Sequence, residues 1–453
     1  MPFMGIVDTE KWTDADSDLR PLDWTARLFL QNPNGMMFNN GHVPITGFTS
    51  LIGNVIPTTD PEFKWWQKEF AAQRASITAD TTVFTNAAKS TAYSTTYTTN
   101  QASSGTVLYI TVPLDFAKQA VPGYTMLMMD EDDNRAIMRT LITDKIENGA
   151  DSTIVCRTLK NDSGTATYGV DTADKLEIMG SLFEEGSNAP DGMHYDPTKF
   201  TNYTAIHKNA VEQTGTALAT EQRVDNDYME DVREQGELHA FGLERDAIFG
   251  TSFETTGPNG KPLRGSGGVW EFITDNSPAT HNVDYRRDTD FAGLTWRQGG
   301  ADFLKKFLVE YSIYAEESLV ICGNLVLQAI EDLAEYLGWQ SLQVQDVLFG
   351  IRVNTWVTPY GELHFMPHPA FTLQDAWKRM CIVFNPKNVF KRPLRNETHN
   401  RDTAFVEDVD FDQNVNFAAR PDAKRAGWLT EAGWQFTNPK QFGILDGFGV
   451  DRS

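Results

Sequence analysis

The sequence predicts a mixed α+β fold, and three observations carry this prediction. Residues 225–250 have the pattern of one long helix, and residues 200–220 alternate apolar and polar side chains as a strand does. Residues 303–375 alternate amphipathic helices with short apolar strands. Hydrophobic residues make up 40% of the 453 positions, which is enough to bury a substantial core. The length favours about three lobes.

The long helix is predicted from its two ends and from its apolar stripe. Asp227 can cap its start, Glu230 follows in the spacing of a capping box, and Gly250 is a natural stop. Apolar or small side chains recur at a period of about 3.6 residues, at Tyr228, Val232, Gly236, His239, Leu243 and Ala247. Because this stripe is thin and the other faces are charged, we expect a strut that lies along a sheet.

The segment before this helix resembles a known protein family. It is a predicted strand that alternates through Tyr203, Ala205, His207 and Val211 and then turns at Gly215. The run NYTAI…VEQTGTALAT and the acidic helix ending in LERDAIFG resemble the major capsid proteins of tailed double-stranded DNA phages. The resemblance implies a Hong Kong 97-type capsid fold, in which such a strand leads into the spine helix of a peripheral domain. The alternative is an ordinary hairpin and exposed helix of an unrelated α+β protein.

The resemblance also implies a division of the chain into parts. These are an N-terminal arm (1–50), an extended loop region (51–200), a peripheral domain with the spine helix (201–300), an axial α/β domain (301–375), and return strands to the peripheral domain with a C-terminal segment (376–453). Short strand patterns separated by turns predict a β-rich module at about residues 113–186. Whether this module is an inserted domain or part of the extended loop stays open.

The N-terminal arm (1–50) and residues 79–112 are expected to contact neighbouring subunits. Trp12, Trp24 and Phe29 favour docking of the arm over a flexible terminus. Residues 79–112 are rich in Thr, Ser and Tyr, and the matching region of the family is the extended loop that crosses an adjacent subunit. The sequence has no long charged helical extension at its N-terminus, so a separate scaffolding protein is expected.

Six side chains are the expected structural and assembly contacts. The stretch TDPEFKWWQ also resembles the phage proteins, with its two tryptophans and Phe70 as anchors. Val232 and Leu243 are the main aliphatic anchors of the long helix. The full set is Trp65, Trp66, Tyr203, Val232, Leu243 and Ile248.

The axial part has the clearest pattern. A broad apolar helical face runs from Phe303 to Ala315, the strand SLVIC ends at Gly323, and a second helix stops at Gly338. A strand pair then closes around Pro359-Tyr360-Gly361. Residues 251–302 are aperiodic and are expected to be a crossing between domains. The strand RMCIVFNPKNV is expected to return to the peripheral domain.

No motif for catalysis or phosphate binding survives inspection. The run GPNGKPLRGSGG fails as a phosphate loop, because Thr255 stands where the first Gly belongs and Pro262 follows Lys261. Lys89 lies where some capsids of this fold form a Lys–Asn crosslink, but no pattern marks the Asn or the assisting carboxylate. We therefore predict no enzyme, no cofactor and no catalytic residue.

Metal sites are also not predicted. His364 and His368 lack a third ligand at a convincing spacing. The run from Asp408 to Asn414 imitates a calcium loop, but Gln413 and Ala419 stand where Gly and Glu belong. The acidic turn at residues 130–134 is best read as a solvated hairpin tip.

Composition adds the environment and the partners. The three cysteines, Cys156, Cys322 and Cys381, each lie in an apolar strand-like run and are expected to be buried thiols. No apolar run approaches the roughly 18 residues that span a bilayer, so no membrane partner is expected. The net charge is −23, with 39 basic and 62 acidic residues, which predicts only weak, non-specific contact with DNA.

These features predict a structural shell protein of the virion, assembled in the host cytoplasm. Its expected partners are further copies in hexamers and pentamers of an icosahedral head, a scaffolding protein and a portal protein. Decoration or cement proteins stay open. The alternatives are an encapsulin-type nanocompartment shell and, in a different class, an α/β hydrolase-like enzyme without a recognisable motif.

Overall fold

The computed structural model describes most of the chain. The described residues are 36–39, 43–46, 52–69, 73–77, 87–88, 105, 107–131, 134, 136–148, 152–161, 174–188, 190, 192–193, 196–220, 227–315, 317–337, 343–348, 351–407 and 423–451. They form two compact units, one built from residues 1–65 and 199–453 and the other from residues 66–198. Predictions for Trp12, Trp24, Phe29, Phe70, Lys89 and the run from Asp408 to Asn414 lie outside the described residues.

The first unit contains an antiparallel sheet that follows the predicted strand. Strand β11 (Ala205–Thr214) pairs along its whole length with β22 (Ala423–Phe436), which also pairs with β20 (Val389–Pro393) and β21 (Ala404–Glu407). Strand β10 (Thr198–Tyr203) pairs with β3 (Glu62–Gln67). A short helix, α3 (Gly215–Ala219), starts at the predicted Gly215 turn.

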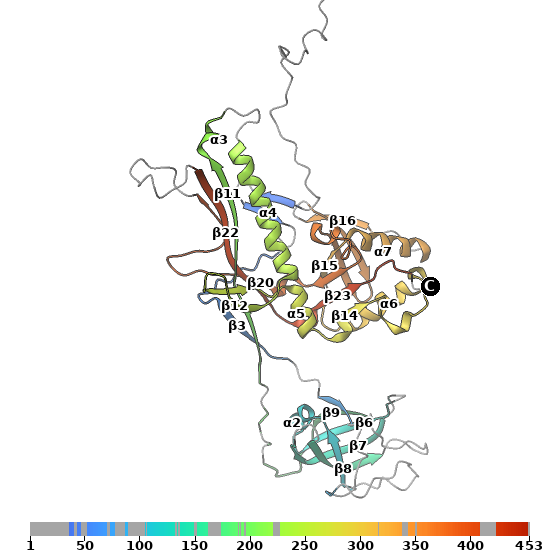
Figure 1. The fold of residues 1–453 in the computed structure, drawn as a ribbon. Coiled ribbons are helices and arrows are strands. Elements are labelled where there is room, and N and C mark those ends of the chain that lie inside the picture. Colours follow the sequence, from blue (N-terminus) through green and yellow to red (C-terminus); the bar gives the residue numbers. More distant parts are fainter. Residues whose placement is uncertain are drawn as a thin grey trace, which may run out of the picture. The chain divides into compact units, whose positions relative to one another are not determined.

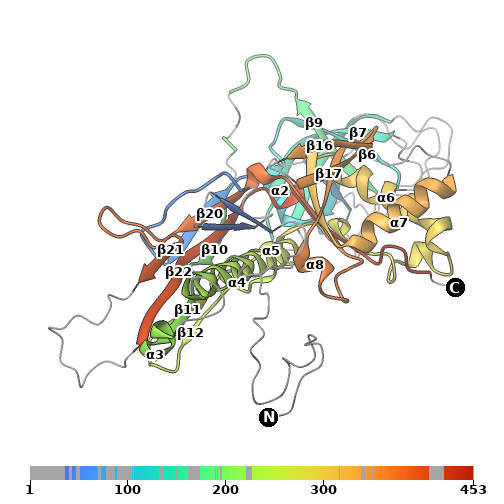
Figure 2. The same cartoon turned by 90° about the horizontal axis from the view of Figure 1, so that it is seen from above.

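The long helix α4 (Asp227–Phe249) lies along this sheet, as the stripe predicted (Figures 1 and 2). It begins at Asp227, and Gly250 follows its last turn. The predicted stripe is buried at Val232, Gly236, His239, Leu243 and Ala247 and half-buried at Tyr228. Ala240 and Ile248 are buried as well, so the stripe widens toward the C-terminal end, where the helix enters a core. The hairpin of β1 (Met36–Asn39) and β2 (Val43–Thr46) lies beside the helix through β2.

A seven-stranded mixed sheet forms the α/β lobe of the same unit. Its order is β14 (Asn282–Asp284), β23 (Phe442–Asp446), β19 (Cys381–Phe384), β15 (Glu317–Cys322), β18 (Gly361–Pro367), β17 (Ile351–Thr358) and β16 (Gln343–Leu348). The pairs β14–β23 and β15–β18 are parallel and the others are antiparallel. The predicted strand SLVIC and the turn at Pro359-Tyr360 are present as β15 and the β17–β18 connection.

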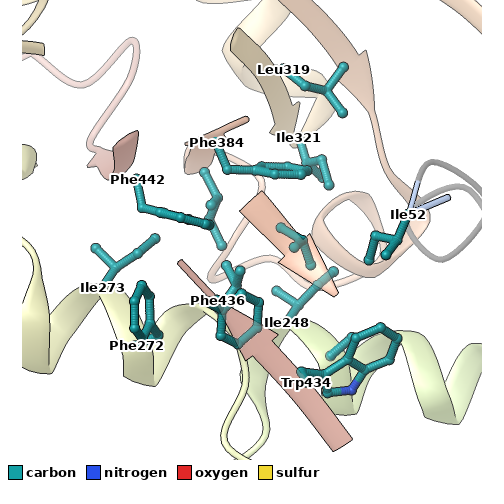
Figure 3. Packing of buried hydrophobic residues seen from close by; sticks show 14 of the residues in the cluster. Ile52, Ile248, Phe272, Ile273, Leu319, Ile321, Phe384, Trp434, Phe436 and Phe442 are labelled. Atoms are coloured by element: carbon teal, nitrogen blue, oxygen red, sulfur yellow. The ribbon is translucent and has the colours of Figure 1, made fainter. Parts of the chain in front are cut away.

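Each face of this sheet carries its own core because strand side chains alternate. Val320 and Cys322 of β15 face helices α6 (Trp296–Tyr311) and α7 (Asn324–Leu337). Leu319 and Ile321 face the opposite core, which also holds the end of α4, helix α5 (Val269–Asn276), helix α8 (Pro369–Thr372) and the end of β22. Figure 3 shows this second core, where Ile248, Phe272 and Trp434 gather with Phe384 and Phe442. The spine-like helix and the α/β sheet therefore share one core.

Two expectations for this unit are wrong in detail. Residues 251–302 are not aperiodic, because they contain the hairpin of β12 (Phe253–Thr256) and β13 (Pro262–Gly265), helix α5, strand β14, short 3₁₀ turns and the first turns of α6. The strand in RMCIVFNPKNV does not return to the sheet beneath α4. It is β19, which lies between β15 and β23 in the α/β lobe. The return is made by β20, after the 3₁₀ turn at Pro386–Asn388.

The second unit is a six-stranded antiparallel sheet with a separate core. Its order is β4 (Arg74–Ser76), β9 (Lys175–Ser181), β6 (Tyr124–Met129), β7 (Ala136–Ile146), β8 (Ser152–Asn161) and β5 (Val107–Val112), with helix α2 (Leu114–Gln119) following β5. Buried residues of β5, α2, β6, β7, β8 and β9 pack together. The sheet thus begins earlier than the predicted module, because β4 and β5 belong to it.

Candidate assembly surface

The N-terminal half of α4 is fixed to the sheet by a tryptophan. Val232, Val211 and Trp428 form a small buried cluster. The indole N–H of Trp428 donates to the carbonyl of Val232 (3.1 Å). A Cβ at Gly236 would lie 3.1 Å from the same indole ring, so the glycine in the stripe gives the tryptophan its room. Val232 and Gly236 belong to the predicted stripe, whereas their partner Trp428 lies 196 positions after Val232 and was not predicted.

The middle of α4 is fixed by a buried histidine. Nδ1 of His239 lies 2.9 Å from Oδ1 of Asn209, and Nε2 lies 2.8 Å from Oγ1 of Thr430. Thr430 continues this contact to the hydroxyl of Thr403 (3.0 Å). Burial lowers the pKa of His239 to about 4, and the positive charges of His207 and Lys391 act in the same direction. The imidazole is therefore neutral at neutral pH and joins α4 to both β11 and β22.

The C-terminal half of α4 meets the α/β lobe through a buried polar pair. Nε2 of His368 lies 2.9 Å from Oε1 of Glu244, and each side chain is 1% exposed. The angle at Nε2 does not complete a hydrogen bond. Nδ1 of His368 accepts the backbone N–H of Ala370 (3.1 Å) and so caps α8. His368 thus serves the junction between the helix and the lobe.

His364, the other histidine that was considered and rejected as a metal ligand, also has protein partners. Its Nδ1 lies 3.0 Å from Oγ1 of Thr355, and its Nε2 lies 3.4 Å from a carboxylate oxygen of Glu317. Within the described ranges, no group of three or more His, Cys, Asp or Glu side chains is arranged to hold a metal ion. The described helices include none that is long and apolar enough to cross a membrane.

The predicted tryptophan pair divides between the two faces of β3. Trp65 is 8% exposed and stacks on Phe63 and Phe200, with ring centroids 6.0 Å and 5.7 Å away. Trp66 is 61% exposed on the opposite face, as strand alternation requires. Trp65 is therefore a core anchor, whereas Trp66 is available to a neighbour.

The remaining predicted contacts lie on the sheet and the helix. Tyr203 is half-buried at the end of β10, and its carbonyl lies 2.4 Å from where a Cβ at Gly433 would stand. Leu243 is 8% exposed, and Ile248 is 1% exposed in the shared core. The structure thus brings Trp65 and Ile248 into one core and Val232 into another cluster, and it leaves Trp66 outside both.

The outer face of α4 remains open to solvent. Met229 and Leu238 are 47% and 57% exposed, and Arg233 reaches toward Glu230 (3.9 Å) and Glu237 (3.5 Å). The described residues thus offer packing surfaces joined to a rigid core. They carry no arrangement suited to bond-making chemistry.

The cysteines are buried, as predicted, but two of them are neighbours. Burial raises the pKa of all three thiols, that of Cys156 to about 12. Cys322 and Cys381 lie directly opposite each other on β15 and β19. The two cysteines are 59 positions apart in the chain (381 − 322), so their pairing could not be predicted from the sequence.

Comparisons with known proteins address identity. A family model described as "SU10 major capsid protein" matches residues 37–449. The major capsid protein of Pseudomonas phage PaMx41 is 24% identical over 226 residues, and the alignment spans 48% of this chain and 51% of that relative, about half of its length.

Solved structures give more distant likenesses. A structure from Mycobacterium phage Bobi has a TM-score of 0.39 at 10% identity, covering 59% of this chain and 81% of that one. The SrpI encapsulin of Synechococcus elongatus PCC 7942 has a TM-score of 0.37 at 11% identity, covering 57% and 79%. A chain from Mycobacterium phage Patience has a TM-score of 0.36 at 13% identity, covering 60% and 80%.

Proposed function

The chain belongs to the family of SU10 major capsid proteins, and from this premise we propose that its copies assemble into the hexamers and pentamers of an icosahedral phage head that encloses double-stranded DNA. Family membership makes it a structural protein of the virion capsid, as the sequence resemblance predicted. It decides against both alternatives, the encapsulin-type nanocompartment and the hydrolase-like enzyme. The fold is mixed α+β and of the Hong Kong 97-like kind.

The observation that supports assembly most directly is the shared core at the end of α4. Helix α4 rests on the β11–β22 sheet at one end and enters the core of the seven-stranded sheet at the other. In such a subunit, packed side chains on α4 and not flexible loops connect the two sheets, so a force on one sheet is passed to the other. We assign helix α4 and the sheet of β11, β20, β21 and β22 to the peripheral domain, and the seven-stranded sheet, which includes β14, to the axial domain.

We also propose that the unit at residues 66–198 is an inserted domain. Its six strands close around buried residues of their own, which a simple extended loop does not need. Residues 79–112 would include the part that reaches an adjacent subunit. A scaffolding protein, a portal protein and weakly held DNA complete the proposed set of partners, whereas decoration proteins stay open.

Assembly can be tested directly. The full chain, expressed alone and together with the phage's scaffolding protein, is expected to form capsomers or closed shells. Light scattering and negative-stain microscopy would detect them. A well-behaved monomer under both conditions would contradict the proposal.

A further inference from the structure

The hairpin of β12 and β13 has a lysine at its tip, and two carboxylates of helix α5 line a cavity beside its base. Phe253 pairs with Gly265 at the base, and Thr256 pairs with Pro262 near the tip. All four residues of β12 are exposed. The hairpin is a sheet of two strands in which β13 lies beside β11, whereas β12 is exposed.

A cavity of about 290 Å³ lies beside the base of this hairpin. Four aromatic side chains, Trp65, Phe200, Phe272 and Phe436, line it together with Glu271 and Asp275. The two carboxylates stand four positions apart on α5, so they share one face of the helix. A long aliphatic side chain with a charged end fits such a site, because its stem packs on rings while its head meets the carboxylates.

The carboxylates lack a cation of their own. Oε2 of Glu271 accepts the backbone N–H of Ser252 (2.7 Å). Burial raises the pKa of Glu271, the hydrogen bond from Ser252 opposes this, and the charge of Asp275 adds to it. Among the described residues, neither carboxylate forms an ion pair. A cation in the cavity would relieve this repulsion.

The wall of the cavity also contains a buried hydrogen-bond donor, the indole N–H of Trp65. The indole nitrogen of Trp65 is buried and has no hydrogen-bond partner in the described part of the chain. A buried donor without an acceptor is rare in a completed structure. The wall is therefore expected to gain an acceptor, such as a backbone carbonyl, when an incoming segment fills the cavity.

The complementary charge is Lys261 at the hairpin tip. Its backbone carbonyl accepts the N–H of Gly257 (2.8 Å), which closes the turn. Its side chain is exposed and makes no ion pair with any described residue. Each strand has four residues, so tip and base are separated by about 13 Å at roughly 3.3 Å per residue. Lys261 therefore cannot reach the cavity of its own chain while the hairpin is paired.

We propose that Lys261 of one copy inserts into the cavity at the hairpin base of a second copy, where its ammonium group meets Glu271 and Asp275. This inference rests on the proposed assembly of identical copies. Tip and base are different surfaces of the same hairpin, so the contact is heterologous and propagates from copy to copy until a ring closes. The second copy is favoured because it supplies a cation of matching charge on an exposed arm. A basic segment of the scaffolding protein is the competing occupant.

Charge exchange between the two surfaces tests this pairing. Lys261→Glu and Asp275→Lys are each made in the full chain, together with the double variant that carries both. Each single variant is expected to lower the yield of capsomers or shells by roughly tenfold, since like charges facing each other across an interface are strongly unfavourable. The double variant restores an opposite-charge pair between positions 261 and 275, so its yield should rise clearly above that of either single variant, while the unchanged Glu271 keeps it below the wild type.

Control variants distinguish a loss of the proposed contact from a general effect of charge or from misfolding. Lys387→Glu and Glu397→Lys change exposed charges elsewhere on the same unit and should leave the yield unchanged. Glu271→Gln should weaken assembly without lowering the Tm of the free subunit, because the raised pKa of Glu271 marks a carboxylate that does not stabilise the isolated fold.

The outcomes distinguish the two levels of proposal. A double variant no better than the worse single variant, with wild-type shells present, overturns the pairing but leaves the capsid function standing. If the variants lower the shell yield only when the scaffolding protein is present, the cavity binds that protein, and the proposed pairing between copies is overturned. Failure of the wild-type chain to assemble at all overturns both.

Discussion

His239 is a buried histidine whose neutral form the fold requires. Both ring nitrogens are engaged, by Asn209 and Thr430, and the side chain is 1% exposed. A proton would bring charge into a site where no described carboxylate pairs with that ring, close to Lys391, whose charge lowers the same pKa. The residue therefore joins helix and sheet at neutral pH and opposes that junction in acid.

The free subunit should accordingly lose stability in acid through His239. Its pKa is about 4 in the folded protein against an ordinary value of 6.5, so between these values the unfolded chain binds the proton and the folded chain does not. The free energy of unfolding then falls as pH falls from 6.5 to 4. Relative to His239→Gln, the wild-type Tm should decline across this window. The exposed His399→Gln is the control, and parallel curves for wild type and His239→Gln would refute the assignment.

At the scale of the element, α4 is an amphipathic helix with an unusually narrow contact. Its buried positions lie on one stripe, and Leu238 and Glu234 on other faces are exposed. A narrow contact concentrates the packing free energy in few side chains, so single truncations there are costly and truncations elsewhere are not.

Leu243 and Leu238 make a matched pair on this helix. Leu243 is 8% exposed and Leu238 is 57% exposed. Truncation of a buried Leu to Ala costs about 2–5 kcal/mol, whereas Leu238→Ala and Glu234→Ala should stay within about 0.5 kcal/mol. Chemical denaturation of the free subunit measures this, and shell yield is scored separately because an exposed face can contact a neighbour. Equal stability of Leu243→Ala and Leu238→Ala would show that the stripe is not packed against the sheet.

The position of α4 and the periodicity of its buried stripe could be predicted from the sequence, because helix periodicity and glycine stops are local signals. The sequence placed β15 and the β17–β18 turn for the same reason. It failed for β19, whose four residues are apolar on both faces. Such a run fits any buried strand position, so only its partners β15 and β23 decide the sheet to which it belongs.

The candidate site was predictable only in part. Trp65 and Val232 were found from aromatic and helical patterns, but their partners Phe200 and Trp428 lie far away in the sequence. The hairpin before α5 was missed because its glycines and prolines read as a loop. The signal that was available is the alternation around Leu263 and the helix VWEFITDN that follows.

At the scale of the whole molecule, charge limits what the subunit can hold. The chain has 62 acidic and 39 basic side chains, a net charge of −23. Several of those cations are already used internally, as in the pairs of Lys306 with Asp288 (2.9 Å) and Lys391 with Asp402 (2.6 Å). Affinity for duplex DNA comes mainly from basic groups that displace counterions, and a cation held in an internal ion pair is less available for that purpose.

The free subunit should therefore bind duplex DNA at or beyond the weak end of the non-specific range, about 10⁻⁴ to 10⁻⁶ M at physiological salt. Filter binding across a series of salt concentrations measures both the affinity and its salt dependence. A shallow dependence is expected as well, since the slope reports the number of phosphates neutralised. Sub-micromolar binding with a steep slope would show that a basic surface is concentrated on one face despite the net charge. Assembled shells need a separate measurement, because the proposed contact with packaged DNA would involve only the surface that faces the interior.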